Sequence, residues 1–180
     1  MSIMKRNYRI RRQCEGDIER NFTCGDSDLD DFFKNDSLHY SVQKLATSYV
    51  VEGEDALLAY FSIANDSISI EDFYKSSSFN RFRKRFANAK RLKGYPAVKL
   101  CRLAVIEFAK GQGIGTEIVN FLKGTFYKKQ RSACRFLLVD AYRESVDFYL
   151  KNGFTPINEM PDLQKHTIPM YFDLADMDIH

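Results

Sequence analysis

The chain of 180 residues has no tryptophan, and none of its apolar runs approaches the roughly 20 residues of a membrane-spanning helix. Residues 1–6 lack the apolar core of a signal peptide, so we expect a cytoplasmic protein without a membrane partner. A chain of this length buries enough apolar surface to fold without disulfide bonds. Since no linker, repeat or low-complexity tract interrupts it, we expect a single domain over residues 1–180.

Metal ligands are also scarce. The cysteines Cys14, Cys24, Cys101 and Cys134 form no Cys-x-x-Cys pair, and the three histidines are isolated from one another. No metal-ligand spacing results, so the sequence predicts reduced thiols and no metal site. Cys101 lies in a predicted central strand, where a small buried hydrophobe is a more common role than a nucleophile.

The net charge is only +3, but one segment is strongly basic. Residues 81–93 contain seven basic residues and no acid, and Phe82 and Phe86 lie four residues apart. This pattern predicts an amphipathic helix with a cationic outer face. Basic residues interleaved with aromatic ones suit nucleic-acid phosphates, although a merely solvated face has the same pattern. The candidate nucleic-acid residues are Arg81, Arg83, Lys84, Arg85, Lys90, Arg91 and Lys93.

A strand, a glycine turn and a helix follow one another from residue 97 onward. Residues 97–105 are mostly apolar or β-branched, as in a strand covered on both faces. Glycines stand at positions 111, 113 and 115, and apolar residues then recur at helical spacing from residue 114. The start of such a helix binds anions, because its unpaired N–H groups and dipole point at one place. Neither the dinucleotide fingerprint nor the nucleotide-hydrolase phosphate loop fits this spacing.

Further elements are expected on both sides of this stretch. The patterns predict strands over residues 8–13, 47–52, 56–64, 135–141 and 168–174. They also predict a helix that Ser27 caps, with Leu29, Phe32 and Phe33 on its apolar face, and a short helix that Gly153 ends. Val146, Tyr149 and Leu150 share one face of that short helix.

Three segments resemble the GNAT family of acyl-coenzyme A N-acyltransferases. Lys110-Gly111-Gln112-Gly113-Ile114-Gly115 is similar to its pyrophosphate loop, Arg/Gln-x-x-Gly-x-Gly/Ala, with lysine in the first position. Phe148-Tyr149-Leu150-Lys151-Asn152-Gly153-Phe154 resembles its Phe-Tyr-x-x-x-Gly-Phe signature. Residues 22–33 resemble the opening of a GNAT branch that includes toxins of toxin–antitoxin modules.

The resemblance implies an α/β (α+β) fold, with a mixed, twisted sheet of six or seven strands flanked by about four helices. It implies acetyl-CoA as the cofactor and Tyr149 as the general acid that protonates the leaving thiolate. The final strand would pair with the strand near Phe154. The cofactor-binding residues that it implies are Leu103, Ala104, Val105, Lys110, Gly111, Gln112, Gly113, Ile114, Gly115 and Thr116.

The predicted central strand contains no Asp, Glu or His that could act as a base. A lysine amine, with a pKa of about 10.4, is protonated at neutral pH, whereas an α-amine near 7.7 to 8.0 is partly free. The absence of a base therefore favours α-amine acceptors, unless Glu71, Asp72 or a terminal carboxylate enters the cleft.

Three functions remain open at this stage. The first is an acetyltransferase acting on a small-molecule or peptide amine. The second is a toxin that acetylates the α-amine of aminoacyl-tRNA, blocks translation and is neutralised by a small ribbon-helix-helix antitoxin. The third is a coenzyme A-binding module without catalysis. The sequence leaves open the acceptor, the acyl chain length and whether the chain forms a homodimer.

Overall fold

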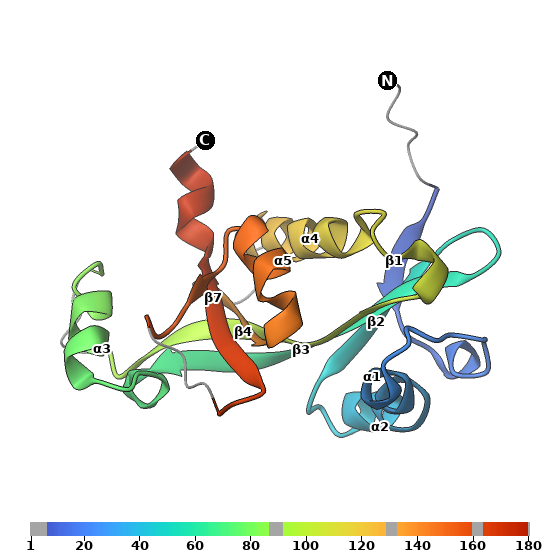
Figure 1. Cartoon of the computed structure of the whole chain (residues 1–180), viewed down its shortest axis with the longest axis horizontal. Helices are drawn as coiled ribbons and strands as arrows, with labels where there is room; N and C mark the ends of the chain where they lie inside the picture. The colour runs from blue at the N-terminus through green and yellow to red at the C-terminus, as the bar shows by residue number, and fades with distance from the viewer. Residues whose placement is uncertain (1–6, 87–91, 129–132, 160–163, 180) are drawn as a thin grey trace. The chain divides into compact units, whose positions relative to one another are not determined.

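The computed structural model describes residues 7–86, 92–128, 133–159 and 164–179, and it contains a seven-stranded sheet (Figure 1). The strand order is β1-β2-β3-β4-β5-β7-β6. This confirms the predicted α/β fold with a mixed sheet. The strands are β1 (Arg9–Arg12), β2 (Thr47–Glu52), β3 (Leu57–Ser69), β4 (Gly94–Val105), β5 (Phe136–Tyr142), β6 (Thr155–Pro156) and β7 (Thr167–Asp173).

Four helical segments accompany the sheet in the part of the chain that the structure describes, as expected. In the first segment, α1 and α2 are joined by a π-helical turn, so that residues 27–42 are helical throughout. None of the described helices is long and apolar enough to cross a membrane. The helices are α1 (Ser27–Asp31), α2 (Ser37–Val42), α3 (Ser76–Arg83), α4 (Ile114–Lys128) and α5 (Val146–Lys151).

The chain divides into two compact units. The first comprises the residues up to Ala64 together with Leu100–Ile118, and the second comprises Asn65–Lys99 and Val119–His180. The strands β3 and β4 each contribute residues to both units. The single-domain organisation stays a prediction.

The first unit has an aromatic core around the segment that begins at Phe22. The rings of Phe33 and Tyr60 pack in a tilted arrangement with their centroids 4.8 Å apart, and Ala104 of β4 packs into the same cluster. The hydroxyl of Tyr60 donates to the carbonyl of Leu29 at 2.6 Å, which satisfies the polar atom of a fully buried ring. This core therefore fixes α1 against β3 and β4.

The cap of α1 differs from the prediction. Asp26, not Ser27, precedes the helix, and its carboxylate accepts from the N–H groups of Asp28 and Leu29 at 3.0 and 3.2 Å. Ser27 is already the first helical residue. A carboxylate at the cap position also carries a full negative charge to the positive end of the helix, which favours the earlier start.

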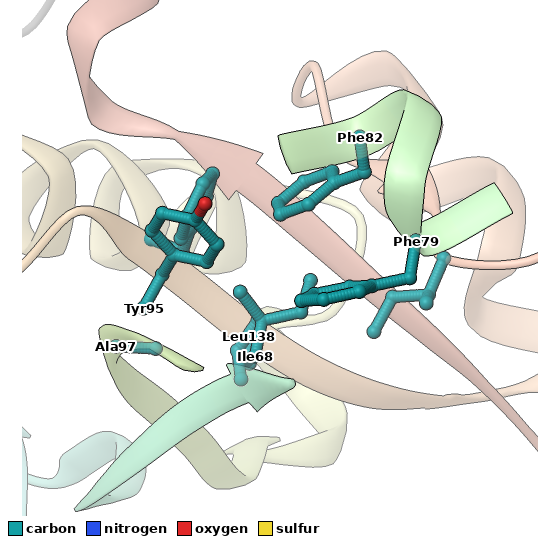
Figure 2. Packing of buried hydrophobic residues seen from close by; sticks show 8 residues of the cluster. Ile68, Phe79, Phe82, Tyr95, Ala97 and Leu138 are labelled. Atoms are coloured by element: carbon teal, nitrogen blue, oxygen red, sulfur yellow. The ribbon is translucent and has the colours of Figure 1, made fainter. Parts of the chain in front are cut away.

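The second unit is built on a cluster of rings from α3, β4 and β5 (Figure 2). Phe82 lies at its centre, with ring centroids 5.4 Å from Phe136 and 5.8 Å from Tyr95. Phe79 and Phe82 are three residues apart on α3 and are both buried. Because residues at this spacing share a helix face, their burial fixes α3 onto the sheet.

The extent of this helix was predicted wrongly. The pattern favoured a helix over residues 81–93, but α3 begins at Ser76 and ends at Arg83. Its serines occupy the first turn, where N–H groups have no intrahelical partner and polar side chains are tolerated. Phe86 packs on Phe82 from the turn that follows, 5.4 Å away. Lys90 and Arg91 lie outside the described residues.

The other predicted strands are confirmed to within three residues, except that β3 runs to Ser69, five residues beyond its predicted end at residue 64. β1 pairs with β2, and β2 with β3, in antiparallel register. β7 pairs antiparallel with β5 along its length, and with β6 at Thr155 and Pro156. The final strand therefore pairs with the strand next to Phe154, as expected.

Candidate active site

The end of β4 lies in the first unit and has one buried and one open face. Ala104 is 3% exposed and packs in the aromatic core, whereas Leu103 and Val105 are partly exposed. Because side chains alternate along a strand, Leu103 and Val105 lie on the face opposite Ala104. This is the face on which an extended ligand can approach the strand.

The segment after β4 is held by backbone hydrogen bonds. The N–H of Ile106 donates to the carbonyl of Leu58 at 2.9 Å, and that of Glu107 donates to the carbonyl of Thr23 at 3.1 Å. Gly25 has φ of +77°, and a Cβ there would lie 2.8 Å from a Glu107 carboxylate oxygen. The start of the segment 22–33, which suggested the toxin branch, therefore supports the chain just ahead of the glycine turn.

The glycine turn itself is open. Gly111 and Gly113 have φ of +73° and +86°, a region that side-chain-bearing residues rarely adopt. A Cβ at either position would meet no atom of the described residues within 4 Å, its chain neighbours aside. The glycines are thus needed for the backbone conformation and leave space beside it, as a closely approaching ligand requires.

The turn leads directly into α4. The N–H of Glu117 donates to the carbonyl of Gly113 at 3.1 Å, so the preceding N–H groups belong to the turn that an α-helix leaves without intrahelical partners. Lys110, which precedes the turn in the chain, is exposed. The side chain of Gln112 folds back, and its amide donates to the carbonyl of Phe108 at 2.9 Å. An open cradle of glycine backbone at a positive helix end fits a pyrophosphate group.

Arg102 is a candidate functional residue of β4 that the sequence analysis did not identify. Its guanidinium lies 4.9 Å from the centroid of the Phe32 ring and donates to the carbonyl of Cys101 at 3.0 Å. The Nε atom is buried without a hydrogen-bond partner, and no carboxylate of the described residues lies within ion-pair distance of it. Nothing in its local pattern distinguishes it from an ordinary strand residue, because the ring that it packs on, Phe32, belongs to the π-helical turn far away in the sequence.

Two acids, Asp30 of the first unit and Asp72 of the second, have structural roles. The carboxylate of Asp30 accepts from the N–H of Cys24 at 2.8 Å and from the hydroxyl of Thr23 at 2.7 Å. Burial alone would raise the pKa of Asp30, but these hydrogen bonds outweigh it and lower the pKa. In the second unit, the carboxylate of Asp72 accepts from the N–H of Ser69 at 2.6 Å. Carboxylates with lowered pKa or engaged in caps are weak bases.

Tyr149 lies in the second unit, on α5. Its side chain is 6% exposed and packs against Phe148 and Phe154, with ring centroids 4.9 and 5.4 Å away. Its hydroxyl makes no hydrogen bond to a described residue. Burial raises the pKa of Tyr149 above its usual value, so the phenol stays protonated at working pH. Leu150 is 46% exposed, so the predicted apolar face of α5 is buried only in part.

Lys123 of α4 supports the end of α5 and was also missed. Its ammonium donates to the carbonyl of Asn152 at 2.6 Å and lies 3.9 Å from the ring centroid of Phe172. Burial lowers the pKa of Lys123. Gly153 ends α5 with φ of +77°, as predicted, and a Cβ there would lie 3.2 Å from Phe172. Only the packing of α4 on β7, which the sequence does not show, reveals this role of Lys123.

The described basic residues of the candidate nucleic-acid segment lie around the end of α3. Arg81 and Arg83 are in its last turn, and Lys84 and Arg85 follow in a turn. The guanidinium of Arg85 lies 4.8 Å from the ring centroid of Phe82, and that of Arg83 lies 5.8 Å from Phe79. Lys93 is exposed just before β4.

A seven-stranded sheet with a glycine cradle between a central strand and a helix is the architecture of an acyl-CoA acyltransferase. A family profile described as an acetyltransferase (GNAT) domain matches residues 69–171, more than half of the chain. The chain therefore belongs to the GNAT family, and it is an acetyl-CoA-dependent N-acetyltransferase.

Solved structures share this fold over nearly the whole chain. A complex of AtaT with acetyl-methionyl-tRNAfMet has a TM-score of 0.75 and 18% identity, covering 96% of this chain and 98% of that one. A tyrosine-to-phenylalanine variant of KacT has a TM-score of 0.74 and 18% identity, with the same coverage. AtaTR bound with acetyl-CoA has a TM-score of 0.71 and 18% identity, covering 96% of each chain. No curated protein sequence matches the chain.

Proposed function

We propose that the chain transfers an acetyl group by direct attack of an α-amine on the thioester of acetyl-CoA. The observation that carries this proposal is that β4 contains no Asp, Glu or His, and that two acids of the described residues, Asp30 and Asp72, are engaged in structural hydrogen bonds. An α-amine needs little help at neutral pH, because its pKa of about 7.7 to 8.0 leaves part of it unprotonated.

The first unit supplies binding and electrostatic stabilisation. Backbone N–H groups from Gly113 to Gly115 hold the pyrophosphate, because that of Gln112 already donates to the carbonyl of Ala109, and Lys110 adds a positive charge. Backbone groups of Leu103, Ala104 and Val105 bind the pantetheine arm along β4, and an amide there polarises the thioester carbonyl. The partly exposed face at Leu103 and Val105 supports this assignment.

Tyr149 provides the proton for the departing sulfur. A phenol with a raised pKa is a weaker acid, so transfer to a thiolate in water would be uphill. The same burial disfavours the thiolate, which raises the pKa of the thiol as well. In a site without water, the pKa values of the phenol and of the thiol are therefore both raised. The free energy of proton transfer between them then approaches zero. The unpaired hydroxyl of Tyr149 supports this role.

A second, narrower function is favoured by the arginines at the end of α3. We infer that the acceptor is the α-amine of an aminoacyl-tRNA, so that the chain is a toxin that blocks translation. Arg81, Lys84 and Arg85 are exposed and Arg83 is partly exposed, and in this proposal they bind the RNA backbone. The structurally similar AtaT has been solved with acetyl-methionyl-tRNAfMet and, as a toxin, with the C-terminus of its antitoxin AtaR. A small antitoxin, of the ribbon-helix-helix type, is the partner that this function requires.

Labelled acetyl-CoA separates the alternatives. We expect label to enter charged total tRNA, and transfer to fall when Arg83, Lys84 and Arg85 are replaced together by glutamine. Label entering only small amines or peptides would contradict the tRNA function while supporting the acetyltransferase. Coenzyme binding without any transfer would instead show a non-catalytic module.

A further inference from the structure

A groove of about 250 Å³ borders the end of α3 in the second unit. None of its lining residues is among those assigned to acetyl-CoA or to proton transfer. Phe73, Phe82 and Tyr171 supply aromatic rings, and Arg81 and Arg85 supply cations. These five residues define what we call the aromatic groove. It is smaller than the roughly 300–1,000 Å³ of sites that enclose a drug-sized ligand, so it suits one planar ring with an attached anion.

We propose that the aromatic groove binds one unpaired nucleotide of an RNA, with its base against the rings and its phosphate on the arginines. Proteins hold unstacked bases between aromatic side chains and arginine planes, and arginine also matches phosphate in a bidentate manner. This inference rests on the proposed tRNA acceptor and names a site through which the chain holds it.

Arg85 is already held in position for this role. Its guanidinium lies 4.8 Å from the Phe82 ring centroid and 5.8 Å from that of Tyr171, and it donates to the Tyr171 hydroxyl at 3.4 Å. No carboxylate of the described residues lies within 4.0 Å of it. Stacking on one face leaves the charge unpaired, so an incoming base or phosphate needs to displace no ion pair.

Arg81 has one partner, which is easily exchanged. Its guanidinium lies 3.2 Å from the carboxylate of Glu159, but the two side chains are 75% and 87% exposed. Such a pair is screened by water and holds its partners weakly. A phosphate in the groove can replace Glu159 as the partner of Arg81. Because the Glu159 carboxylate carries the same sign of charge as the phosphate, it should weaken phosphate binding.

A peptide is a poorer occupant of the groove than RNA. The neighbouring strand β6 ends the sheet order and has only two residues, of which Pro156 also lines the groove. Proline has no N–H, so this edge offers little for an added peptide strand. The arginines would still attract an acidic peptide, which makes such a peptide the competitor to test.

The first test compares two arginines of equal charge. A fluorescein-labelled RNA tetranucleotide, ACCA, is titrated with the full chain at low salt and its anisotropy is followed. Arg85→Gln should weaken binding about tenfold, as loss of a stacked base contact does. Arg83→Gln removes the same charge from a residue that lies over Phe79 and does not line the groove, so it should weaken binding distinctly less than Arg85→Gln. Equal losses in both variants would overturn the groove and leave only unspecific attraction to phosphates.

Three further tests distinguish the contributions of the base, of the charge and of a competing peptide. Four tetranucleotides, each lacking the base at a different position, are titrated with the wild-type chain. One of them should bind about tenfold more weakly than the intact RNA, and equal affinity for all four would contradict the stacked base.

Glu159→Gln should tighten RNA binding about threefold, whereas Glu54→Gln in the β2–β3 turn should not. Hexaglutamate that binds more tightly than the RNA, and loses affinity in Arg85→Gln, would make the groove a peptide site.

None of these binding titrations depends on acetyl transfer. A wild-type chain that binds the RNA in this pattern but transfers no label to charged tRNA would refute the proposed acceptor and keep the groove. Transfer to charged tRNA that is equally sensitive to Arg83→Gln and Arg85→Gln would keep the acceptor and refute the groove.

Discussion

At the scale of single residues, Tyr149 has the most sharply defined environment. Its ring is enclosed by Phe148 and Phe154, so the side chain is a core aromatic as well as a candidate acid. The sequence allowed both interpretations. A purely structural tyrosine gains most from a hydrogen-bonded hydroxyl, but that of Tyr149 makes no bond to a described residue.

Replacing only the hydroxyl distinguishes the two roles. We expect Tyr149→Phe to lower kcat about a hundredfold or more, the usual contribution of a positioned general acid. The Kd for coenzyme A, measured by calorimetry, should stay nearly unchanged because the ring is retained. Tyr40→Phe, at a partly exposed ring of α2, is the matched control and should keep full activity. A parallel loss of coenzyme affinity would show that Tyr149 is structural.

Gly113 gives the corresponding prediction for the cofactor cradle. Gly113→Val places a β-branched side chain at φ of +86°, in space that no protein atom fills. Coenzyme A binding should be lost, while the fold survives at a cost of about 1–2 kcal/mol in backbone strain. Gly16→Val is a control, since a Cβ there also meets open space but φ is not positive. Calorimetric binding of coenzyme A at wild-type affinity to Gly113→Val would exclude this cradle.

At the scale of elements, ion pairs around Arg11 of β1 join this strand to β2 and to the segment that follows β1. The carboxylate of Asp17 is 2% exposed and accepts two hydrogen bonds from Arg11, at 2.7 and 2.8 Å. Arg11 also donates to Glu52 of β2 at 2.9 Å. Burial alone would raise the pKa of Asp17, but the hydrogen bonds from Arg11 and Cys14 outweigh it and lower the pKa.

This cluster makes the stability of the fold depend on acid pH. Because the pKa of Asp17 is lower in the folded chain, its contribution is present above its unfolded pKa of about 3.9 and is lost as the pH falls further. Asp17→Asn should cost about 3 kcal/mol at pH 7 and lower Tm by about 6–12 °C, because it leaves Arg11 without a buried partner. Asp55→Asn, in an exposed turn, should leave Tm nearly unchanged in the same thermal scans. A Tm for Asp17→Asn within one degree of wild type would refute the buried charge pair.

The elements also show what local sequence can predict. β4, the glycine turn and α4 are contiguous, so their apolar pattern and glycines were sufficient. The errors at Ser27 and at residues 81–93 concern where helices begin and end, which depends on which of several polar residues caps and on what the aromatic faces bury. Arg102, Lys123 and the aromatic groove were not predicted, because each is formed by side chains from elements far apart in the chain.

At the scale of the whole molecule, the pH dependence of activity reflects the ionisation of both the acceptor amine and Tyr149. Because burial raises the pKa of Tyr149, the phenol keeps its proton well into the alkaline range. The rate should therefore rise with pH as the α-amine loses its proton near 7.7 to 8.0, and then stay level to about pH 10. Initial rates at saturating acetyl-CoA test this profile. A fall between pH 8 and 9 that Tyr149→Phe abolishes would show that the tyrosine ionises there.

The choice between α- and ε-amines tests the central claim most directly. Two peptides of one sequence are compared at pH 7, one with a free α-amine and a blocked lysine, and the other with the reverse. A chain without a base should acetylate the first at least about a hundredfold faster, since the pKa values of about 7.7 to 8.0 and 10.4 set the free-amine fractions. Faster transfer to the lysine would require a general base in the site. It would contradict an acetyltransferase that uses a general acid but no general base.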